Sequence, residues 1–191
     1  MVVGCNTMKD EKESEIKCLE DHHYYLFHQD FNNESCSAAI KFILERNLMN
    51  PLPKFMKIIF NSPGGDLTAA FSLIDVMKIS KVPIHTYGLG QISSCGLFAF
   101  VSGKKGFRYI TENTSILSHQ FSWYTYGKQH ELIAAQREVD NTSKRLLDHY
   151  IKCTGLSEKD VKKYLLPPED VWLTAKEAVK YGIADEIVKH Y

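Results

Sequence analysis

The chain has 191 residues, 44% of them hydrophobic and 24% charged, which is the composition of a globular protein with its own core. Its 23 basic and 23 acidic residues give a formal net charge of zero. This balance argues against nucleic acid as a partner, because a nucleic-acid-binding surface needs an excess of basic residues. The absence of net repulsion permits copies of the chain to associate.

The five cysteines are scattered along the chain: Cys5, Cys18, Cys36, Cys95 and Cys153. An odd number without a Cys-x-x-Cys spacing argues against a disulfide framework and favours reduced thiols in a cytosolic compartment. No apolar run approaches the roughly 18 residues that are needed to span a bilayer. We therefore expect a cytoplasmic protein with no membrane partner.

Composition divides the chain into two unequal parts. Residues 1–21 are mostly polar and 9–15 are nearly all charged, so we expect them to form a mobile N-terminal arm. Residues 22–191 are expected to form a single domain, because apolar runs recur throughout them.

Strand-like and helical patterns alternate along the first half of this domain. In chain order they predict a strand at 24–27, a turn at 32–33, a helix at 38–48, a strand at 58–60, a helix at 67–77, a strand at 82–87, a turn at 90–96 and a helix start at 97–101. The 67–77 helix has the clearest periodicity, with Leu67, Phe71 and Ile74 on one face. We expect Phe71 to be a core residue.

The second half continues the alternation. The patterns predict strands at 107–110 and 115–119, a long helix at 129–153, short helices that begin after Ser157 and Thr174, and a last strand at 183–188. Gly155 ends the long helix, and Thr174 with Glu177 forms a capping box. Trp172 is expected in the core. Strands that alternate with helices indicate an α/β domain.

A serine-containing turn follows the 82–87 strand. Segment 90–96 reads Gly-Gln-Ile-Ser-Ser-Cys-Gly, and Ser94 lies two residues before Gly96. A serine on a sharp strand-to-helix turn presents its hydroxyl outward, and the backbone N–H groups at the helix start can hold an oxyanion. The alternative is that the two serines only cap the helix.

Two further features could complete a site of this kind. Segment 63–65, Pro-Gly-Gly, lies at another strand-to-helix junction, where glycines let backbone N–H groups approach a ligand, although the motif also fits an ordinary turn. His119 ends a predicted strand, where it could activate a serine or be a hydrogen-bonded core histidine. Such a base needs an acid to fix its tautomer, and spacing alone leaves Asp140, Asp170 and Asp185 open.

The motifs, taken in order, resemble those of the proteolytic subunit of the Clp protease. The matching segments are 61–65, 90–96, 103–108, 119–120, 137–138, 154–155, 170–178 and 181–185. The resemblance runs from about Tyr24 to Val188 and implies an α/β fold of the kind shared with crotonases. That fold is a spiral of β-β-α units with a projecting handle helix, which the predicted helix at 129–153 fits. The resemblance also implies a serine endopeptidase that degrades unfolded polypeptides and uses no metal or cofactor.

Carried over position by position, the resemblance implies that Ser94 is the nucleophile, His119 the base and Asp170 the orienting acid. The backbone N–H groups of Gly65 and Cys95 would form the oxyanion hole. The family usually has methionine where this chain has Cys95. A Cys95 nucleophile is the rival interpretation.

The resemblance also implies partners, namely self-association into two stacked heptameric rings, a tetradecamer, fed by an ATP-driven unfoldase. Three departures bear on these partners. Residues 1–21 do not match the hydrophobic pore loops of the family, and Glu169 replaces an arginine that helps to couple the rings. Phe121, Trp123 and Tyr124 stand where the family has a proline and a Gly-Gly pair.

Three alternatives remain at this stage. The chain could be a non-catalytic or modifying ring subunit. It could be an acyl-CoA hydratase or isomerase of the same fold, which would use the oxyanion hole but would need catalytic carboxylates. His22, His23 and His28 could suggest a metal site, but no cysteine or carboxylate cluster completes it.

Overall fold

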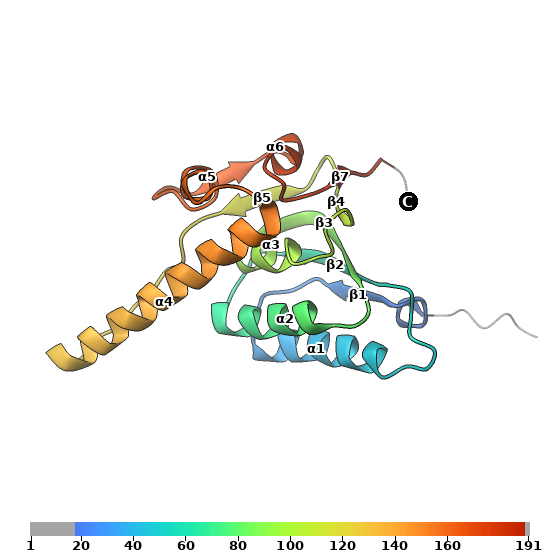
Figure 1. Ribbon diagram of the computed structural model, residues 1–191, viewed down its shortest axis with the longest axis horizontal. Coiled ribbons are helices and arrows are strands. Elements are labelled where there is room, and N and C mark those ends of the chain that lie inside the picture. The colour runs from blue at the N-terminus through green and yellow to red at the C-terminus, as the bar shows by residue number, and fades with distance from the viewer. Residues whose placement is uncertain (1–17, 190–191) are drawn as a thin grey trace, which may run out of the picture.

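The computed structural model describes residues 18–189 (Figure 1). The predicted arm at 1–21 therefore lies almost wholly outside the described residues. The first element is a short 3-10 helix, η1 (Leu19–His22), which leads into β1 (Tyr24–Phe27). None of the helices in the described part combines the length and apolar character that crossing a membrane requires.

Strands and helices alternate along the chain, which makes a mixed α/β fold as the sequence predicts. The elements after β1 are, in chain order, α1 (Asn33–Asn47), β2 (Met56–Ser62), α2 (Leu67–Ile79), β3 (Ile84–Ser93), α3 (Cys95–Phe100), β4 (Arg108–Ile110), β5 (Ser115–Ser118), α4 (Gln129–Thr154), α5 (Glu158–Tyr164), β6 (Val171–Leu173), α6 (Ala175–Lys180) and β7 (Glu186–Ile187).

A mostly parallel sheet forms the centre of the described part, with the strand order β1-β2-β3-β4-β7. The ten-residue strand β3 pairs with β2 along one edge and with two strands in succession along the other. Of these two, β4 pairs with residues 86–88 and β5 with residues 91–93. The short strand β6 then pairs antiparallel with β5. β3 thus belongs to both parts of the sheet, the row β1-β2-β3-β4-β7 and the pair β5-β6. The β5-β6 pair begins next to the serine turn.

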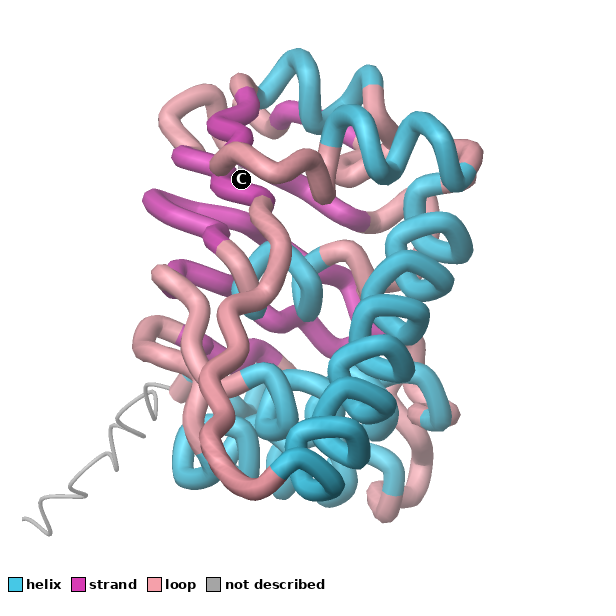
Figure 2. Tube along the Cα trace, turned by 90° about the vertical axis from the view of Figure 1, so that its left-hand side faces the viewer, coloured by secondary structure: helices cyan, strands magenta, loops and turns pink. Residues whose placement is uncertain are grey.

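The long helix α4 lies along one side of the body, and its N-terminal half extends beyond the sheet (Figures 1 and 2). Its buried residues all lie in the C-terminal half: Thr142, Leu146, His149, Tyr150 and Thr154. The first three turns carry no such buried stripe, so this part of the helix has nothing to cover and remains exposed. The helix predicted at 129–153 is confirmed to within one residue.

Several predicted boundaries differ from the structure, and two of the differences have a clear physical cause. α1 begins at Asn33 and not at 38, because Asn32 is its N-cap: the Asn32 side chain accepts from the Ser35 N–H (2.9 Å), and the Ser35 hydroxyl accepts from the Asn32 N–H (3.0 Å). β3 continues as far as Ser93, into the segment 90–96 that was expected to be a turn. Gly90 has a φ of 64°, and the register with β2 shifts there, so the glycine marks a bulge inside a strand.

The segment around Trp172 also departs from prediction. Residues 171–173 form a strand that was not predicted, and Trp172 is 59% exposed instead of lying in the core. Side chains alternate between the two faces of a strand, so the burial of Leu173 turns its neighbour Trp172 outward. Phe71 is partly buried and packs edge-on against the core residue Phe98, with ring centroids 5.2 Å apart.

A buried ion pair joins β4 to the C-terminal segment. Arg108 is 1% exposed, and its Nη2 and Nε donate to the two carboxylate oxygens of Asp185 at 2.6 and 2.9 Å. Its Nη1 donates to the carbonyl of Cys153 near the end of α4 (3.0 Å). The Asp185 carboxylate also accepts from the N–H groups of Gly106 and Arg108. Burial alone would raise the pKa of Asp185, but the hydrogen bonds and charge of Arg108 outweigh it and lower that pKa.

We predict that Asp185→Asn lowers the free energy of unfolding at pH 7 by about 3 kcal/mol, because it leaves the buried Arg108 guanidinium without its counter-charge. A carboxylate whose pKa is lowered by folding stabilises the protein above its unfolded pKa, and this stabilisation is lost as pH falls through the folded pKa. The difference in unfolding free energy between wild type and variant should therefore become smaller in acid. Urea unfolding at pH 7 and at pH 3 measures this difference, and an equal difference at both pH values would contradict the prediction.

Candidate active site

Ser94 occupies the junction between β3 and α3 in a strained backbone conformation. Its φ of 53° and ψ of −120° are rarely adopted by residues other than glycine. The Ser94 N–H donates to the carbonyl of Leu117 on β5 (2.9 Å), and its own carbonyl accepts from the N–H of Phe98 (3.0 Å). The serine side chain makes no capping hydrogen bond to the helix. The geometry is therefore that of a sharp elbow and not that of an ordinary helix cap.

The Pro-Gly-Gly segment packs backbone-first against this elbow. A Cβ atom on Gly64 would lie 2.7 Å from the Cβ of Ser94, and one on Gly65 would lie 2.2 Å from the carbonyl oxygen of Phe31. The Gly64 carbonyl accepts from the Phe31 N–H (2.7 Å), and the Asp66 N–H donates to the Phe31 carbonyl (2.8 Å). Because the two ends of a trans peptide point in opposite directions, the Gly65 N–H points away from Phe31.

Cys95 follows Ser94 as the first residue of α3. Its thiol donates to the carbonyl of Gly65, with an Sγ···O distance of 3.2 Å, and the residue is 4% exposed. Burial raises the pKa of this thiol to about 11. At neutral pH it is therefore a thiol and not the nucleophilic thiolate, which argues against the rival Cys95 nucleophile.

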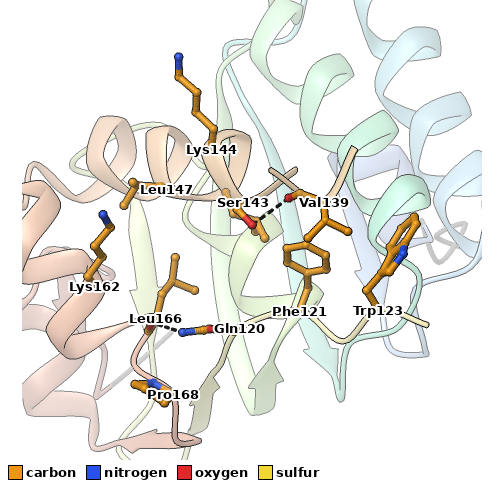
Figure 3. A pocket seen from close by; sticks show the side chains of 11 residues that line it. Gln120, Phe121, Trp123, Val139, Ser143, Lys144, Leu147, Lys162, Leu166 and Pro168 are labelled. Carbon is orange, nitrogen blue, oxygen red and sulfur yellow. Dashed lines mark hydrogen bonds between the residues drawn. The ribbon is translucent and has the colours of Figure 1, made fainter. Parts of the chain in front are cut away.

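His119 follows β5 and lies on the same cavity as Ser94, Gly65 and Cys95. Its Nδ1 is 2.5 Å from the carbonyl oxygen of Gln120. A carbonyl only accepts, so Nδ1 carries the proton of this hydrogen bond and Nε2 is left as the basic nitrogen. The Gln120 side chain in turn donates to the Leu166 carbonyl (3.0 Å; Figure 3), which ties this segment to the loop after α5.

Asp170 lies directly before β6, in the strand pair that also carries His119. The antiparallel register sets Ser118 opposite Val171, and one further step along both chains sets His119 opposite Asp170. Within residues 18–189, however, no hydrogen bond or ion pair joins the two side chains, and Asp170 is not part of the cavity lining. The sheet thus brings the candidate acid beside the candidate base, but without the hydrogen bond that a triad requires.

The two other candidate acids have different surroundings. The Asp185 carboxylate is bound by Arg108, and Asp140 lies on α4, where it accepts from the Gln136 side chain (2.9 Å). By contrast, the described residues offer no hydrogen bond or ion pair to the Asp170 carboxylate. Position and availability therefore favour Asp170 among the three.

The cavity beside Ser94 and His119 has a volume of about 540 Å³. Part of its lining is apolar: Leu67, Phe71, Phe98, Leu146 and Tyr150. One wall is polar and comes from α4, where Arg145 donates to Glu138 (2.5 Å) and to Thr142 (2.7 Å). The Arg145 guanidinium also lies 4.9 Å above the centre of the Phe71 ring. The cavity can therefore accept a large apolar side chain close to the serine.

A second serine–histidine pair lies outside the lining of this cavity. Ser102 Oγ is 3.2 Å from Nε2 of His149, but the same nitrogen is 3.0 Å from the carbonyl of Phe98. That carbonyl requires Nε2 to carry a proton, so this nitrogen cannot take one from Ser102. Burial lowers the pKa of His149 to about 4, which keeps the ring neutral. His149 therefore links α4 to the Phe98 carbonyl of α3 and to Ser102 just after that helix, and the pair is not a catalytic dyad.

Two parts of the site were not identified from the sequence. The backbone of Phe31 holds the glycine segment, and a main-chain contact of this kind leaves no side-chain signal. The polar wall of α4 does leave one, because Glu138, Thr142 and Arg145 are spaced by four and three residues, as neighbours on one helix face are.

Comparisons with known proteins identify the family of the chain. A family model described as Clp protease matches residues 15–191. The chain is also 31% identical over 185 residues to the ATP-dependent Clp protease proteolytic subunit 1 of Chlamydia abortus, an alignment that covers 96% of this chain and 93% of that protein. With a family match over most of its length and a relative covered almost end to end, the chain belongs to the Clp protease family.

Proposed function

We propose that this chain is the serine endopeptidase subunit of a compartmentalised protease, with Ser94, His119 and Asp170 as its triad. The observation that carries the proposal is the shared cavity, where the strained Ser94 elbow meets His119 and the backbone of Gly65 and Cys95. Acyl transfer needs these parts together, namely a nucleophile, a base and paired N–H donors.

The proposed reaction begins when Ser94 Oγ attacks the scissile carbonyl carbon and Nε2 of His119 takes the hydroxyl proton. The resulting oxyanion accepts hydrogen bonds from the N–H groups of Gly65 and Cys95. His119 then donates its proton to the leaving amine, and the acyl group stays on Ser94. Water, deprotonated by the same imidazole, hydrolyses this ester and restores the serine.

One hydrogen bond has to change before this cycle can run as a full triad. Nδ1 of His119 now donates to the Gln120 carbonyl, whereas the Asp170 carboxylate is needed to stabilise the imidazolium. The strand register, continued by one step, sets the two residues opposite each other, so we propose that a rotation of the His119 or Asp170 side chain makes the exchange. The missing bond is also the feature that supports the alternative, a non-catalytic ring subunit.

An acyl-CoA hydratase or isomerase is less well supported, because the cavity carboxylates have structural partners. Asp66 caps α2 by accepting from the Ala69 N–H (2.6 Å). Glu138 accepts from Thr142 and Arg145, and the Thr142 hydrogen bond is the main cause of its lowered pKa. Neither carboxylate has the freedom of a catalytic acid or base.

We also propose the assembly and partners that the family implies, namely two rings of seven subunits, an ATP-driven unfoldase and unfolded polypeptide substrates, in the cytoplasm. The relative from Chlamydia abortus is named as ATP-dependent, which supports an unfoldase partner. The cysteines at 18, 36, 95 and 153 are free thiols, which suits a reducing compartment. Exposed apolar side chains near the start of α4 suit association: Trp123, Tyr124, Tyr126, Leu132 and Ile133.

The first prediction from the proposed function tests the nucleophile. Ser94→Ala should lower peptide hydrolysis by at least about a thousandfold, because only the oxyanion hole and substrate binding remain. A serine-directed phosphonate should label the wild type at residue 94 and leave the variant unlabelled. Labelling that survives Ser94→Ala and disappears in Cys95→Ala would show that the nucleophile is misassigned. A wild-type chain that is neither labelled nor active would favour the non-catalytic subunit.

The second prediction tests the acid. Asp170→Asn should lower kcat by about three to four orders of magnitude, because the amide cannot stabilise the imidazolium that forms on His119. Asp185→Asn is the matched control, which should reduce stability but keep near-normal activity per folded molecule. Rates are compared per active site after titration with the phosphonate. A larger loss in Asp185→Asn than in Asp170→Asn would reject the assignment.

The third prediction concerns assembly. Trp123 and Tyr124 are 52% and 84% exposed, so their rings add apolar surface next to the extended part of α4. Replacing both with glycine should shift the particle-mass distribution towards smaller species, which native mass spectrometry measures. Because Trp123 also lines the cavity, the alternative is a substrate contact. An unchanged mass distribution with broader peptide cleavage would support that alternative and reject the assembly role.

A further inference from the structure

The two proposed oxyanion donors belong to different parts of the fold. The Gly65 N–H lies in the loop between β2 and α2, and the Cys95 N–H begins α3. Within the described residues neither N–H has a hydrogen-bond acceptor, so both are free for a ligand. An oxyanion hole works only if its donors are held at a fixed spacing, because each must lie about 3 Å from the same developing charge.

The loop that contains Gly65 is hydrogen-bonded to Phe31 on the side away from α3. Two hydrogen bonds with the backbone of Phe31 hold the peptide units on either side of Gly65. These bonds set the orientation of the Gly65 N–H but link it to the segment before α1, and not to α3. Within the described residues, a single hydrogen bond joins segment 63–66 to α3, and it runs from the Cys95 thiol to the Gly65 carbonyl.

We propose that Cys95 is a positioning residue, whose thiol ties the Gly65 carbonyl to α3 and thereby sets the spacing between the two oxyanion donors. One residue thus supplies one donor through its backbone and positions the other through its side chain. This inference rests on the proposed function, since it concerns the efficiency of the same oxyanion hole.

The chemistry of the thiol suits this role. A carbonyl oxygen accepts only from a group that keeps its proton, and burial keeps Cys95 protonated at neutral pH. A thiolate at this position would repel the carbonyl and release the loop. The Sγ···O distance of 3.2 Å lies within the range of a hydrogen bond donated by sulfur.

The test compares Cys95→Ala, which removes the donor, with Cys95→Ser, which keeps one. Cys153→Ala is the control, since Cys153 is a partly buried thiol at the end of α4 and is not part of the cavity. Two quantities are measured per phosphonate-titrated site: kcat and KM for a fluorogenic peptide, and the affinity for a peptide boronate. The boronate forms a tetrahedral adduct on serine, and one of its oxygens occupies the oxyanion hole.

We expect Cys95→Ala to lower kcat by about tenfold with KM changed less than about twofold, and to weaken the boronate by a similar factor. Cys95→Ser should recover both to within about threefold of wild type, and Cys153→Ala should change neither. Equal kcat and boronate affinity in the Ala and Ser variants would overturn the inference, as would an effect confined to KM. Failure of the proposed function would give a different result, because the phosphonate would then not label the wild-type chain.

Discussion

The close approach of the glycine segment to the Ser94 elbow is the constraint on which the site depends. No side chain fits at Gly64 or Gly65, because a Cβ atom would lie within 2.7 Å of Ser94 or 2.2 Å of Phe31. With the side chains absent, main-chain groups of two separate loops reach the same cavity. The positive φ values of 108° and 142° at these glycines would strain any other residue. Steric space and backbone conformation thus both require glycine here.

The sheet brings the remaining groups to this point through strand order. β3 bears Ser94 at its end and pairs there with β5, whose own end carries His119. The antiparallel strand β6 then returns beside β5 and sets Asp170 at the register position opposite His119. Residues that are 25 and 51 positions apart along the sequence are therefore placed at adjoining strand ends, although Asp170 does not line the cavity that Ser94 and His119 share. The Arg108–Asp185 ion pair stabilises the far side of the same layer, away from the cavity.

Much of this arrangement was predictable from the sequence, for identifiable reasons. The 67–77 and 129–153 helices have strong periodicity, and the serine turn, the glycine segment and His119 lie at strand ends, where sites collect. The errors arise where tertiary contacts override local pattern. Asn32 caps a helix although an Asn-Asn pair predicts a turn, and Gly90 forms a bulge because β2 pairs across it. The outward orientation of Trp172 was missed because a strand of three residues is too short to show a periodicity. Spacing alone left the acid open, since the pairing of β5 with β6 decides which aspartate lies beside His119.

The hydrogen bonds around the site differ between its two sides. On the side of the proposed oxyanion hole, the Gly65 segment is held by hydrogen bonds to Phe31 and Cys95, and Ser94 is held by Leu117. On the side of the proposed base, residues 119–128 have no regular secondary structure, and the His119 side chain has one hydrogen bond within the described residues, to the Gln120 carbonyl. Electrostatic stabilisation needs rigid donors, whereas proton transfer needs a ring that can change partner during the cycle. The backbone strain at Ser94 has the same basis. A non-glycine residue persists at a φ of 53° only where its surroundings hold it, and here Leu117 and Phe98 bind the Ser94 backbone on both sides.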